Sequence, residues 1–286
     1  MTQSRTVLVL GATGNVGRHV VSQLLAAGVQ VRAVTRHPET VVPRAGLEVV
    51  AGDLTGLDGS GDWDAALDDV PSMFLIWPLL SAELAPALLT VAKRHVHRVV
   101  YLSSMSVDDR REPEANGFWG AVEHAIEKSG LEWTFLRAGG FASNTLGWAD
   151  QIRADGIVRW PYGRAGRSLV HERDLADVAV RALLEDGHVG EKYVLTGPEA
   201  ISQIDQVHAI GEAIGRRLRW EELSPDQARR QLLAAWGDPA FVDGALGYWA
   251  TLIDAPEPVS DAVEKVTGVP ARTFREWAED HREDFR

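Results

Sequence analysis

The sequence predicts an α/β fold with a doubly wound parallel sheet at its centre. In the first half, short runs of apolar and often β-branched residues alternate with longer amphipathic stretches. Runs that are apolar throughout are typical of strands buried on both faces, and helices between them supply the crossovers that parallel strands need. A glycine-rich turn also joins the first apolar run to the first amphipathic stretch, as at the start of a βαβ unit.

The strands and helices of this half follow from the periodicity of its residues. We expect strands at residues 6–10, 29–35, 47–51, 73–77, 98–103 and 133–137. Helices are expected at residues 16–27, 82–94 and 119–129. Right-handed crossovers through these helices would complete a Rossmann-type sheet.

The pattern is less regular after about Gly140. Residues 144–167 contain several glycines and aromatic residues, and we expect an irregular excursion there. A helix and a strand at residues 172–184 and 192–196 return to the sheet, and the later helices are expected at residues 202–214, 225–236, 239–253 and 271–284.

These patterns divide the chain into two parts. We expect a dinucleotide-binding Rossmann domain over residues 1–143, to which residues 168–197 return. Residues 144–167 and 198–286 would form a smaller, mainly helical, substrate-side subdomain. A cleft between two such parts is a usual place for a small substrate.

Composition restricts the class of partner. The 286 residues carry 29 Lys and Arg against 41 Asp and Glu, which gives a formal net charge of −12. An acidic surface disfavours nucleic acid and anionic membranes, so we expect a small-molecule substrate, no direct nucleic acid and no membrane. The chain has no cysteine, which excludes a thiolate nucleophile, and we predict no metal site. The short polar N-terminus does not have the pattern of a signal peptide, so a cytoplasmic location is expected.

The first turn carries the motif Gly11-Ala-Thr-Gly14-Asn-Val-Gly17. In such a motif the first glycine permits a tight turn, the second lets the backbone approach a pyrophosphate, and the third lets helix and strand pack closely. The N–H groups at the helix N-terminus then face the phosphates. Glycines also serve ordinary turns, but the order strand, glycines, helix favours a dinucleotide site. The residues expected to contact the dinucleotide there are Gly11, Thr13, Gly14, Asn15, Val16 and Gly17.

The end of the second strand indicates which dinucleotide is bound. An NAD site usually has Asp or Glu there to hold the ribose 2′-hydroxyl, whereas this chain has Arg36. A guanidinium matches a 2′-phosphate in charge and geometry, so NADP(H) is favoured. NAD(H) stays open, since Arg36 could instead be a solvated surface residue. After the third strand, Asp53 could bind the adenine amino group or serve as a turn residue, and Leu54 belongs to the same predicted cofactor segment.

Together these motifs resemble the NmrA-like group of atypical short-chain dehydrogenases/reductases. The similar segments are GATGNVG, the arginine in VTRHP, GDL, LSS at residues 102–104, SGLEWTFLRAGGFASN at residues 129–144 and VHERDLADVA at residues 170–179. The resemblance covers nearly the whole chain, and it is specific for the group but not for a substrate. It implies an NAD(P)H-binding protein with a Rossmann fold.

The resemblance also implies roles for residues after the fourth, fifth and sixth strands. Those that would line the cofactor channel or close over the nicotinamide are Trp77, Pro78, Ser103, Gly140 and Phe141. Ser104 would face the nicotinamide beside Ser103, and Asn144 would lie on the substrate side. Core packing for Trp77 and capping of a strand end for the serines are the alternatives. The chain departs from the group at Ala138, where many members have proline.

The proton-transfer pair of typical short-chain dehydrogenases is absent. Those enzymes use Tyr-x-x-x-Lys, whose two positions fall near Ala115 and Trp119 in this chain. None of the four tyrosines is followed four residues later by lysine. Alcohol–ketone chemistry with this pair is therefore not expected.

Three functions are compatible with these residues. The one we predict is an NADPH-dependent reductase that passes hydride to a small apolar or aromatic acceptor, such as a quinone or dye, which takes its proton from water. Positioning of donor and acceptor would supply most of the rate. The alternative is a non-catalytic NADP(H) redox sensor that acts through a protein partner, for which NmrA-like regulators are the precedent. A cofactor-retaining isomerase or cyclase is the third choice.

Aromatic residues favour a flat apolar ligand, although each could instead fill the core. The predicted substrate pocket comprises Ser104, Phe118, Trp119, Asn144, Trp148, Trp160 and Tyr248. Ser104 is a candidate hydrogen-bond donor to the substrate, and the catalytic residues are otherwise unknown. We expect Glu123 to be solvated or structural and His171 to belong to a buried or interfacial network.

Overall fold

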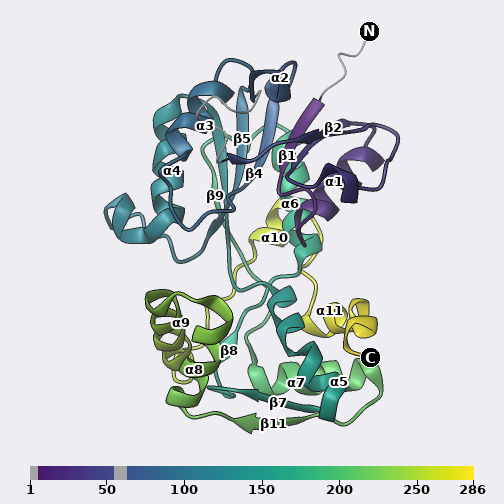
Figure 1. Cartoon of the computed structure of the whole chain (residues 1–286), viewed down its shortest axis with the longest axis vertical. Coiled ribbons are helices and arrows are strands. Elements are labelled where there is room, and N and C mark those ends of the chain that lie inside the picture. The colour runs from purple at the N-terminus through teal and green to yellow at the C-terminus, as the bar shows by residue number, and fades with distance from the viewer. Residues whose placement is uncertain (1–5, 55–62) are drawn as a thin grey trace. The chain divides into compact units, whose positions relative to one another are not determined.

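The chain folds into two compact units in the computed structural model, which describes residues 6–54 and 63–286 (Figure 1). Unit 1 contains Met1–Gly139, Glu172–Leu195 and Ala262–Val269. Unit 2 contains Gly140–His171, Thr196–Asp261 and Pro270–Arg286. Each unit has its own hydrophobic core.

Unit 1 is built on a seven-stranded sheet in the order β3-β2-β1-β4-β5-β6-β9, in which all neighbouring strands are parallel. The order reverses between β1 and β4, which creates the switch point at which doubly wound sheets bind ligands. The strands are β1 (Thr6–Leu10), β2 (Gln30–Thr35), β3 (Leu47–Ala51), β4 (Ser72–Ile76), β5 (Arg98–Ser104), β6 (Glu132–Ala138) and β9 (Lys192–Leu195).

Helices cover both faces of this sheet (Figure 1). Leu88 of α3 and Ile126 of α4 pack in one core with Met73 of the sheet. On the other face α1 contacts α6, and Gln23 Nε2 donates a hydrogen bond to Asp177 Oδ1 at 2.6 Å. The helices are α1 (Gly17–Ala26), α2 (Trp63–Leu67), α3 (Ala85–Ala92), α4 (Gly117–Ser129), α6 (Glu172–Leu184) and α10 (Ala262–Thr267), with short 3-10 turns at Pro38–Thr40 and Pro113–Asn116.

The predicted fold class, a Rossmann-type parallel sheet, is confirmed. Every strand predicted for this sheet is found, and its bounds differ from the prediction by at most one residue. The helix expected at residues 82–94 is shorter and begins at Ala85, because Pro86 lies in its first turn. Proline is tolerated there since the N–H groups of the first turn have no partner within the helix.

Unit 2 corrects the prediction that residues 144–167 are irregular. Most of them belong to a 3-10 helix (Ala142–Trp148), α5 (Ala149–Asp155), β7 (Ile157–Trp160) and β8 (Gly166–Arg167), and residues 161–165 form the turn before β8. The strand β7 pairs in parallel with β11 (Arg219–Glu222), and β8 pairs antiparallel with β10 (Ile201–Ser202). These strands are too short to show a period, and their partners lie far along the chain, so the local sequence does not indicate them.

The remaining helices of unit 2 form two small clusters. Trp277 of α11 packs with Val207 and Ile210 of α7, and Leu232 of α8 packs with Val242 of α9. The helices are α7 (Gln203–Ile214), α8 (Pro225–Trp236), α9 (Pro239–Thr251) and α11 (Phe274–Asp280), followed by a 3-10 turn at Arg282–Phe285.

The helix predicted at residues 271–284 starts later than expected. Its first residue is Phe274, because Thr273 forms a capping box with Glu276 in which each side chain binds the backbone N–H of the other residue. His171 is buried, and its Nε2 lies 3.3 Å from Asp280 Oδ2, as expected for a buried network. Among the helices of residues 6–54 and 63–286, none has the length and apolar character required to cross a bilayer.

Candidate functional site

The glycine loop between β1 and α1 depends on two of its glycines for its shape. Gly11 has φ +80°, a conformation that favours glycine, and a Cβ there would lie 2.9 Å from Ile76 Cβ. A Cβ on Gly17 would lie 2.0 Å from the Gly11 carbonyl oxygen, so only glycine lets α1 pack against the turn. Gly14 is exposed, and a Cβ there would meet only the Gly11 oxygen, at 3.3 Å.

The N-terminus of α1 offers unpaired donors. Within the described residues, the backbone N–H groups of Asn15, Val16 and Gly17 have no hydrogen-bond partner, and no side chain caps the helix. Thr13 and Gly14 are exposed in front of them. Free N–H groups and the positive end of a helix dipole form a phosphate site. The loop therefore fits the pyrophosphate of a dinucleotide.

Arg36 lies directly after β2 and is exposed. No hydrogen bond or ion pair holds its guanidinium within the described part of the chain. Because β2 pairs with β1 at Leu10↔Val34, Arg36 lies at the same edge of the sheet as the glycine loop. Its neighbour His37 has a partner, with Nδ1 3.3 Å from Glu39 Oε1. Arg36 is thus available to bind an anion at this edge.

The segment after β3 lies beside the end of β2, because the Gly52 N–H donates to the Thr35 carbonyl at 3.0 Å. Asp53 is exposed, and its carbonyl oxygen accepts a hydrogen bond from Trp63 Nε1 at 3.3 Å. Leu54 is buried and packs in the core of unit 1. The side chain of Leu54 thus contributes to the core, while Asp53 lies at the edge predicted for the adenine.

Trp77 is also part of the core of unit 1, and its Nε1 donates to the Ser81 carbonyl at 2.8 Å. The following residue, Pro78, is exposed. This placement agrees with core packing, the alternative considered for Trp77. Contact of these two residues with a cofactor stays a prediction.

The two serines at the end of β5 have different environments. Ser103 is buried, and its hydroxyl donates to Glu123 Oε1 at 2.5 Å. The hydroxyl of Ser104 lies 2.9 Å from that of Ser106 and also accepts from the Ser106 N–H. Ser103 is therefore engaged with α4, and Ser104 is the more accessible of the two.

A buried charged network between β6 and α4 was not predicted. Arg137 Nη2 donates to Glu123 Oε2 at 2.6 Å and to Asp109 Oδ1 at 2.6 Å. Lys192 Nζ donates to the same Asp109 oxygen at 2.9 Å. The hydrogen bond from Arg137 lowers the pKa of Asp109 to about 2, and Lys192 contributes to the shift. The signal available in the sequence was an arginine inside the apolar strand WTFLRA, since a buried charge requires a partner.

Tyr101 faces the same network but does not suit proton transfer. Its side chain is fully buried, and its hydroxyl is the one enclosed side-chain polar atom without a hydrogen-bond partner among the residues described. Burial, together with the charge of Glu123, raises its pKa. Tyr101 therefore does not replace the missing tyrosine of the proton-transfer pair.

Phe118 and Trp119, predicted for the substrate pocket, lie in the first turn of α4. Their ring centroids are 4.1 Å apart, and both side chains are half-buried. Ala115 precedes them in the 3-10 turn and is exposed. Of the two positions predicted for the pair, Ala115 therefore lies just before α4 and Trp119 in its first turn.

Four tryptophans of unit 2 form a row. The ring centroids of Trp148 and Trp160 are 6.3 Å apart, and those of Trp160 and Trp249 are 5.7 Å apart. Trp236 continues the row at 6.1 Å from Trp249. Two of the predicted pocket residues, Trp148 and Trp160, are therefore neighbours, and the predicted Tyr248 precedes Trp249 on α9.

The other residues predicted for the site in unit 2 are Gly140, Phe141 and Asn144, at the beginning of this unit. Val170 donates to the Gly140 carbonyl at 2.8 Å and forms a β-bridge with Phe141. Asn144 is exposed in the following 3-10 helix. A Cβ on Gly140 would lie 2.1 Å from Arg167 Nη2, so the guanidinium of Arg167 occupies the place that a side chain would take.

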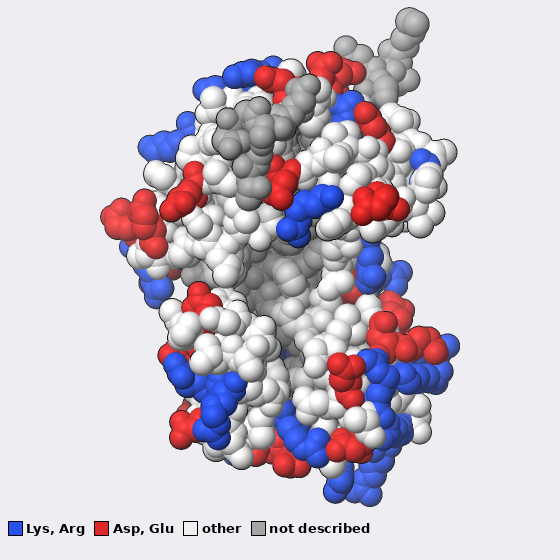
Figure 2. Space-filling view, in the orientation of Figure 1, with Lys and Arg blue, Asp and Glu red and all other residues white. Residues whose placement is uncertain are grey.

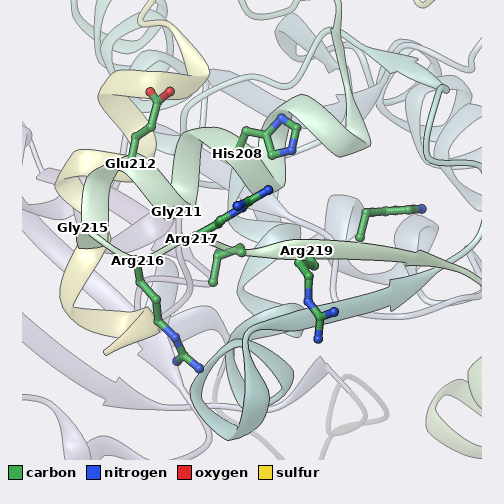
Figure 3. A pocket seen from close by; sticks show the side chains of 9 residues that line it. His208, Gly211, Glu212, Gly215, Arg216, Arg217 and Arg219 are labelled. Atoms are coloured by element: carbon green, nitrogen blue, oxygen red, sulfur yellow. The ribbon is translucent and has the colours of Figure 1, made fainter.

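A depression of about 670 Å³ on unit 2 is lined by residues of α7, of β11 and of the turn between them, and its three arginines come from the turn and from β11. Figure 3 shows Arg216 and Arg219 pointing away from His208 and Glu212, so the charges do not converge on one point. Arg216 is engaged with the Ile152 carbonyl at 2.7 Å. On the face seen in Figure 2, Lys and Arg are interspersed with Asp and Glu.

Residues 11–186 match the family described as NAD(P)H-binding, and the chain belongs to this family. The match begins at the glycine loop and ends just after α6, so of the seven-stranded sheet it includes β2 to β6. The resemblance to NmrA-like NAD(P)H-binding oxidoreductases is thereby confirmed.

Two relatives extend over nearly the full length of the chain. One is the (4-alkanoyl-5-oxo-2,5-dihydrofuran-3-yl)methyl phosphate reductase of Streptomyces griseus, 40% identical and covering 98% of this chain and 99% of the relative. The other is an NAD(P)H azoreductase of Xenophilus azovorans, 33% identical and covering 98% of this chain and 99% of the relative. Among solved structures, an NADPH-dependent quinone oxidoreductase of Escherichia coli in complex with NADPH has the same fold, with a TM-score of 0.78, 22% identity and coverage of 96% and 99%.

Proposed function

We propose that the protein is an NADPH-dependent reductase that transfers hydride to a small, conjugated acceptor without a tyrosine–lysine pair. The observation that carries the proposal is Arg36, an exposed guanidinium with no partner in the described residues, at the sheet edge beside the glycine loop. An acidic residue after the second strand binds the ribose 2′-hydroxyl of NAD, whereas an arginine accommodates the 2′-phosphate of NADP. This difference supports NADP(H) over NAD(H).

The other residues of the site would bind and orient the cofactor, which supplies the hydride when bound. The N–H groups at the start of α1 would hold the pyrophosphate, and Asp53 would accept a hydrogen bond from the adenine amino group. Ser104 would donate to the acceptor while the Ser106 hydroxyl donates to Ser104, an arrangement that leaves the Ser104 hydrogen free. Positioning of donor and acceptor then supplies most of the rate.

The acceptor class rests on what the relatives reduce. A dihydrofuranone with an alkanoyl group, an azo compound and a quinone all contain a conjugated system. The electron pair delivered with the hydride spreads over carbonyl oxygens, nitrogen or an aromatic ring, and the proton can follow from water. Such an acceptor suits a chain in which Ala115 and Trp119 stand where a proton-transfer pair is otherwise found.

Turnover tests this proposal. The protein would be mixed with NADPH and, in turn, the acyl dihydrofuranone phosphate, a naphthoquinone, an azo dye and a simple ketone. We expect NADPH oxidation with at least one conjugated acceptor and none with the ketone, and calorimetry should show tighter binding of NADPH than of NADH. Tight NADPH binding without oxidation by any acceptor would contradict the reductase, and turnover of the ketone would contradict the acceptor class.

A further inference from the structure

Unit 2 contains an ion pair that is held from several sides. Arg167 Nε donates to Glu257 Oε1 at 2.8 Å, and the two side chains are 14% and 1% exposed. The second carboxylate oxygen accepts the Ser168 N–H at 2.9 Å, and the Tyr248 hydroxyl donates to Oε1 at 3.0 Å. A buried carboxylate that accepts from three donors is well satisfied and holds its arginine in one position.

The donors around Glu257 are themselves fixed. Burial, followed by the charge of Glu257, raises the pKa of Tyr248, so its hydroxyl keeps its proton and remains a donor. The Glu257 N–H donates to the Gly166 carbonyl at 3.0 Å, which joins this segment to β8. The Nε side of the Arg167 guanidinium is therefore fully engaged.

The terminal nitrogens of Arg167 are in a different situation. Within the described residues, Nη1 and Nη2 have no hydrogen-bond partner. They are not enclosed, since the Tyr101 hydroxyl is the one fully enclosed side-chain polar atom that lacks a partner in this part of the chain. Gly140 makes room for them, because a Cβ there would lie 2.1 Å from Nη2. The guanidinium thus presents two open donors from a fixed position.

One aromatic ring lies beside the guanidinium, and a second ring lies beside the first. Arg167 Cζ lies 6.0 Å from the ring centroid of Trp249, which in turn lies 5.7 Å from that of Trp160. The ring surface of Trp249 and Trp160 is therefore apolar, and the Arg167 guanidinium beside Trp249 is cationic. A ligand with a flat apolar body and one anionic group matches both features.

We infer that Arg167 is a specificity-determining residue whose terminal N–H groups bind an anionic oxygen group of the substrate, while the substrate's apolar body lies against Trp249 and Trp160. The two parallel donors of a guanidinium match the two oxygens of a carboxylate or phosphate. Glu257 and Gly140 act as positioning residues for Arg167. This inference rests on the proposed function, and it adds that the conjugated acceptor is an anion.

Binding of matched ligands tests the inference. The probes are a neutral naphthoquinone, the same ring with a carboxylate arm and the same ring with a phosphate arm, and quenching of tryptophan fluorescence reports their affinity. We expect the wild type to bind at least one charged probe about tenfold more tightly than the neutral one, as for hydrogen bonds to charged groups. Preference for the phosphate or for the carboxylate arm identifies the substrate group.

The variant Arg167→Met combined with Glu257→Gln removes both charges, so no unpaired carboxylate is left in the core. This double variant should lose the preference for the charged probe and keep its affinity for the neutral one. Arg164→Met is the matched control, because Arg164 is an exposed arginine in the same segment without a partner in the described residues. It should keep the preference.

Equal binding of all three probes by the wild type would overturn the inference. So would a preference that survives in the double variant, or one that is lost equally in the Arg164→Met control. The measurement needs no turnover, so it is separate from the test of the proposed function. If the protein prefers the charged probe through Arg167 but oxidises no NADPH, the proposed reductase activity is contradicted. The inference of an anion-binding site at Arg167 would still hold.

Discussion

Arg137 and Glu123 form an ion pair inside unit 1, with Arg137 Nη2 2.6 Å from Glu123 Oε2 and side chains that are 7% and 4% exposed. The pair joins β6 to α4, and Asp109 connects the same guanidinium to the surface. A complete buried pair adds little net stability, but removal of one partner leaves an unpaired charge in a medium of low dielectric. Single substitutions should therefore have large effects here.

Arg137→Met is expected to lower the free energy of unfolding by about 3–5 kcal/mol, because it leaves the buried carboxylate of Glu123 without its cation. Urea denaturation measures the change. The control is Arg94→Met, which removes the surface pair with Asp64 whose side chains are 55% and 53% exposed. That change should be below about 1 kcal/mol. Equal losses of unfolding free energy in the two variants would show that burial of the pair does not increase the cost of removing its arginine.

Asp109 makes the stability of unit 1 dependent on pH. Its pKa is lowered to about 2 in the folded protein, first by the hydrogen bond from Arg137 and then by Lys192. A carboxyl group with a depressed pKa stabilises the fold above its unfolded pKa of about 4, and this stabilisation is lost as the pH falls towards 2. The difference in unfolding free energy between wild type and Asp109→Asn should be constant above about pH 5 and shrink towards pH 2. A difference that does not vary with pH would exclude this role.

The glycine loop provides a contrast between two small substitutions. Gly17→Ala should destabilise the protein, because its Cβ would lie 2.0 Å from the Gly11 carbonyl oxygen. Gly14→Ala should leave the melting temperature nearly unchanged, since its Cβ meets a single atom at 3.3 Å, but it should weaken NADPH binding. Calorimetry and thermal unfolding of both variants separate the two effects. Undiminished NADPH affinity in Gly14→Ala would place the pyrophosphate elsewhere.

Arg36→Ala tests the preference for NADPH. We expect the Kd for NADPH to rise about tenfold or more, as for loss of a hydrogen bond between charged groups, and the Kd for NADH to change little. The control is Arg44→Ala, which removes another exposed arginine between β2 and β3, one that reaches Ser22 Oγ at 3.4 Å. Parallel losses of both dinucleotides in Arg36→Ala would remove this arginine from the 2′-phosphate site.

The sequence was sufficient for the sheet of unit 1 and insufficient for the strands of unit 2. The strands of the sheet are mainly apolar runs of four to seven residues that alternate with helices, and this alternation is visible without knowledge of the partner strands. The strands β7 and β8 have four and two residues, and they exist because β11 and β10 pair with them. The local sequence pattern does not show which distant segments will pair.

The conformation of the glycine loop was predictable, because it is set by the backbone. The roles of Gly11 and Gly17 follow from their place between strand and helix, and the structure shows the close contacts that require them. The environment of Ser103 could not be predicted in this way, because its hydroxyl binds Glu123, a partner 20 residues away. The same holds for Arg167, whose partner Glu257 lies 90 residues along the chain.

Gly140→Ala should reproduce the effect of losing Arg167 without touching the arginine itself. The new methyl group would lie 2.1 Å from Nη2 and 2.7 Å from Leu169 Cδ2, so the guanidinium must move away from its present position. We expect the preference for the charged naphthoquinones to fall and the unfolding free energy to drop by about 1–3 kcal/mol from overpacking. Gly147→Ala is the control, since a Cβ there meets nothing within 4 Å, and it should change neither quantity. A preference that persists in Gly140→Ala despite the loss of stability would mean that the position of the guanidinium does not determine anion binding.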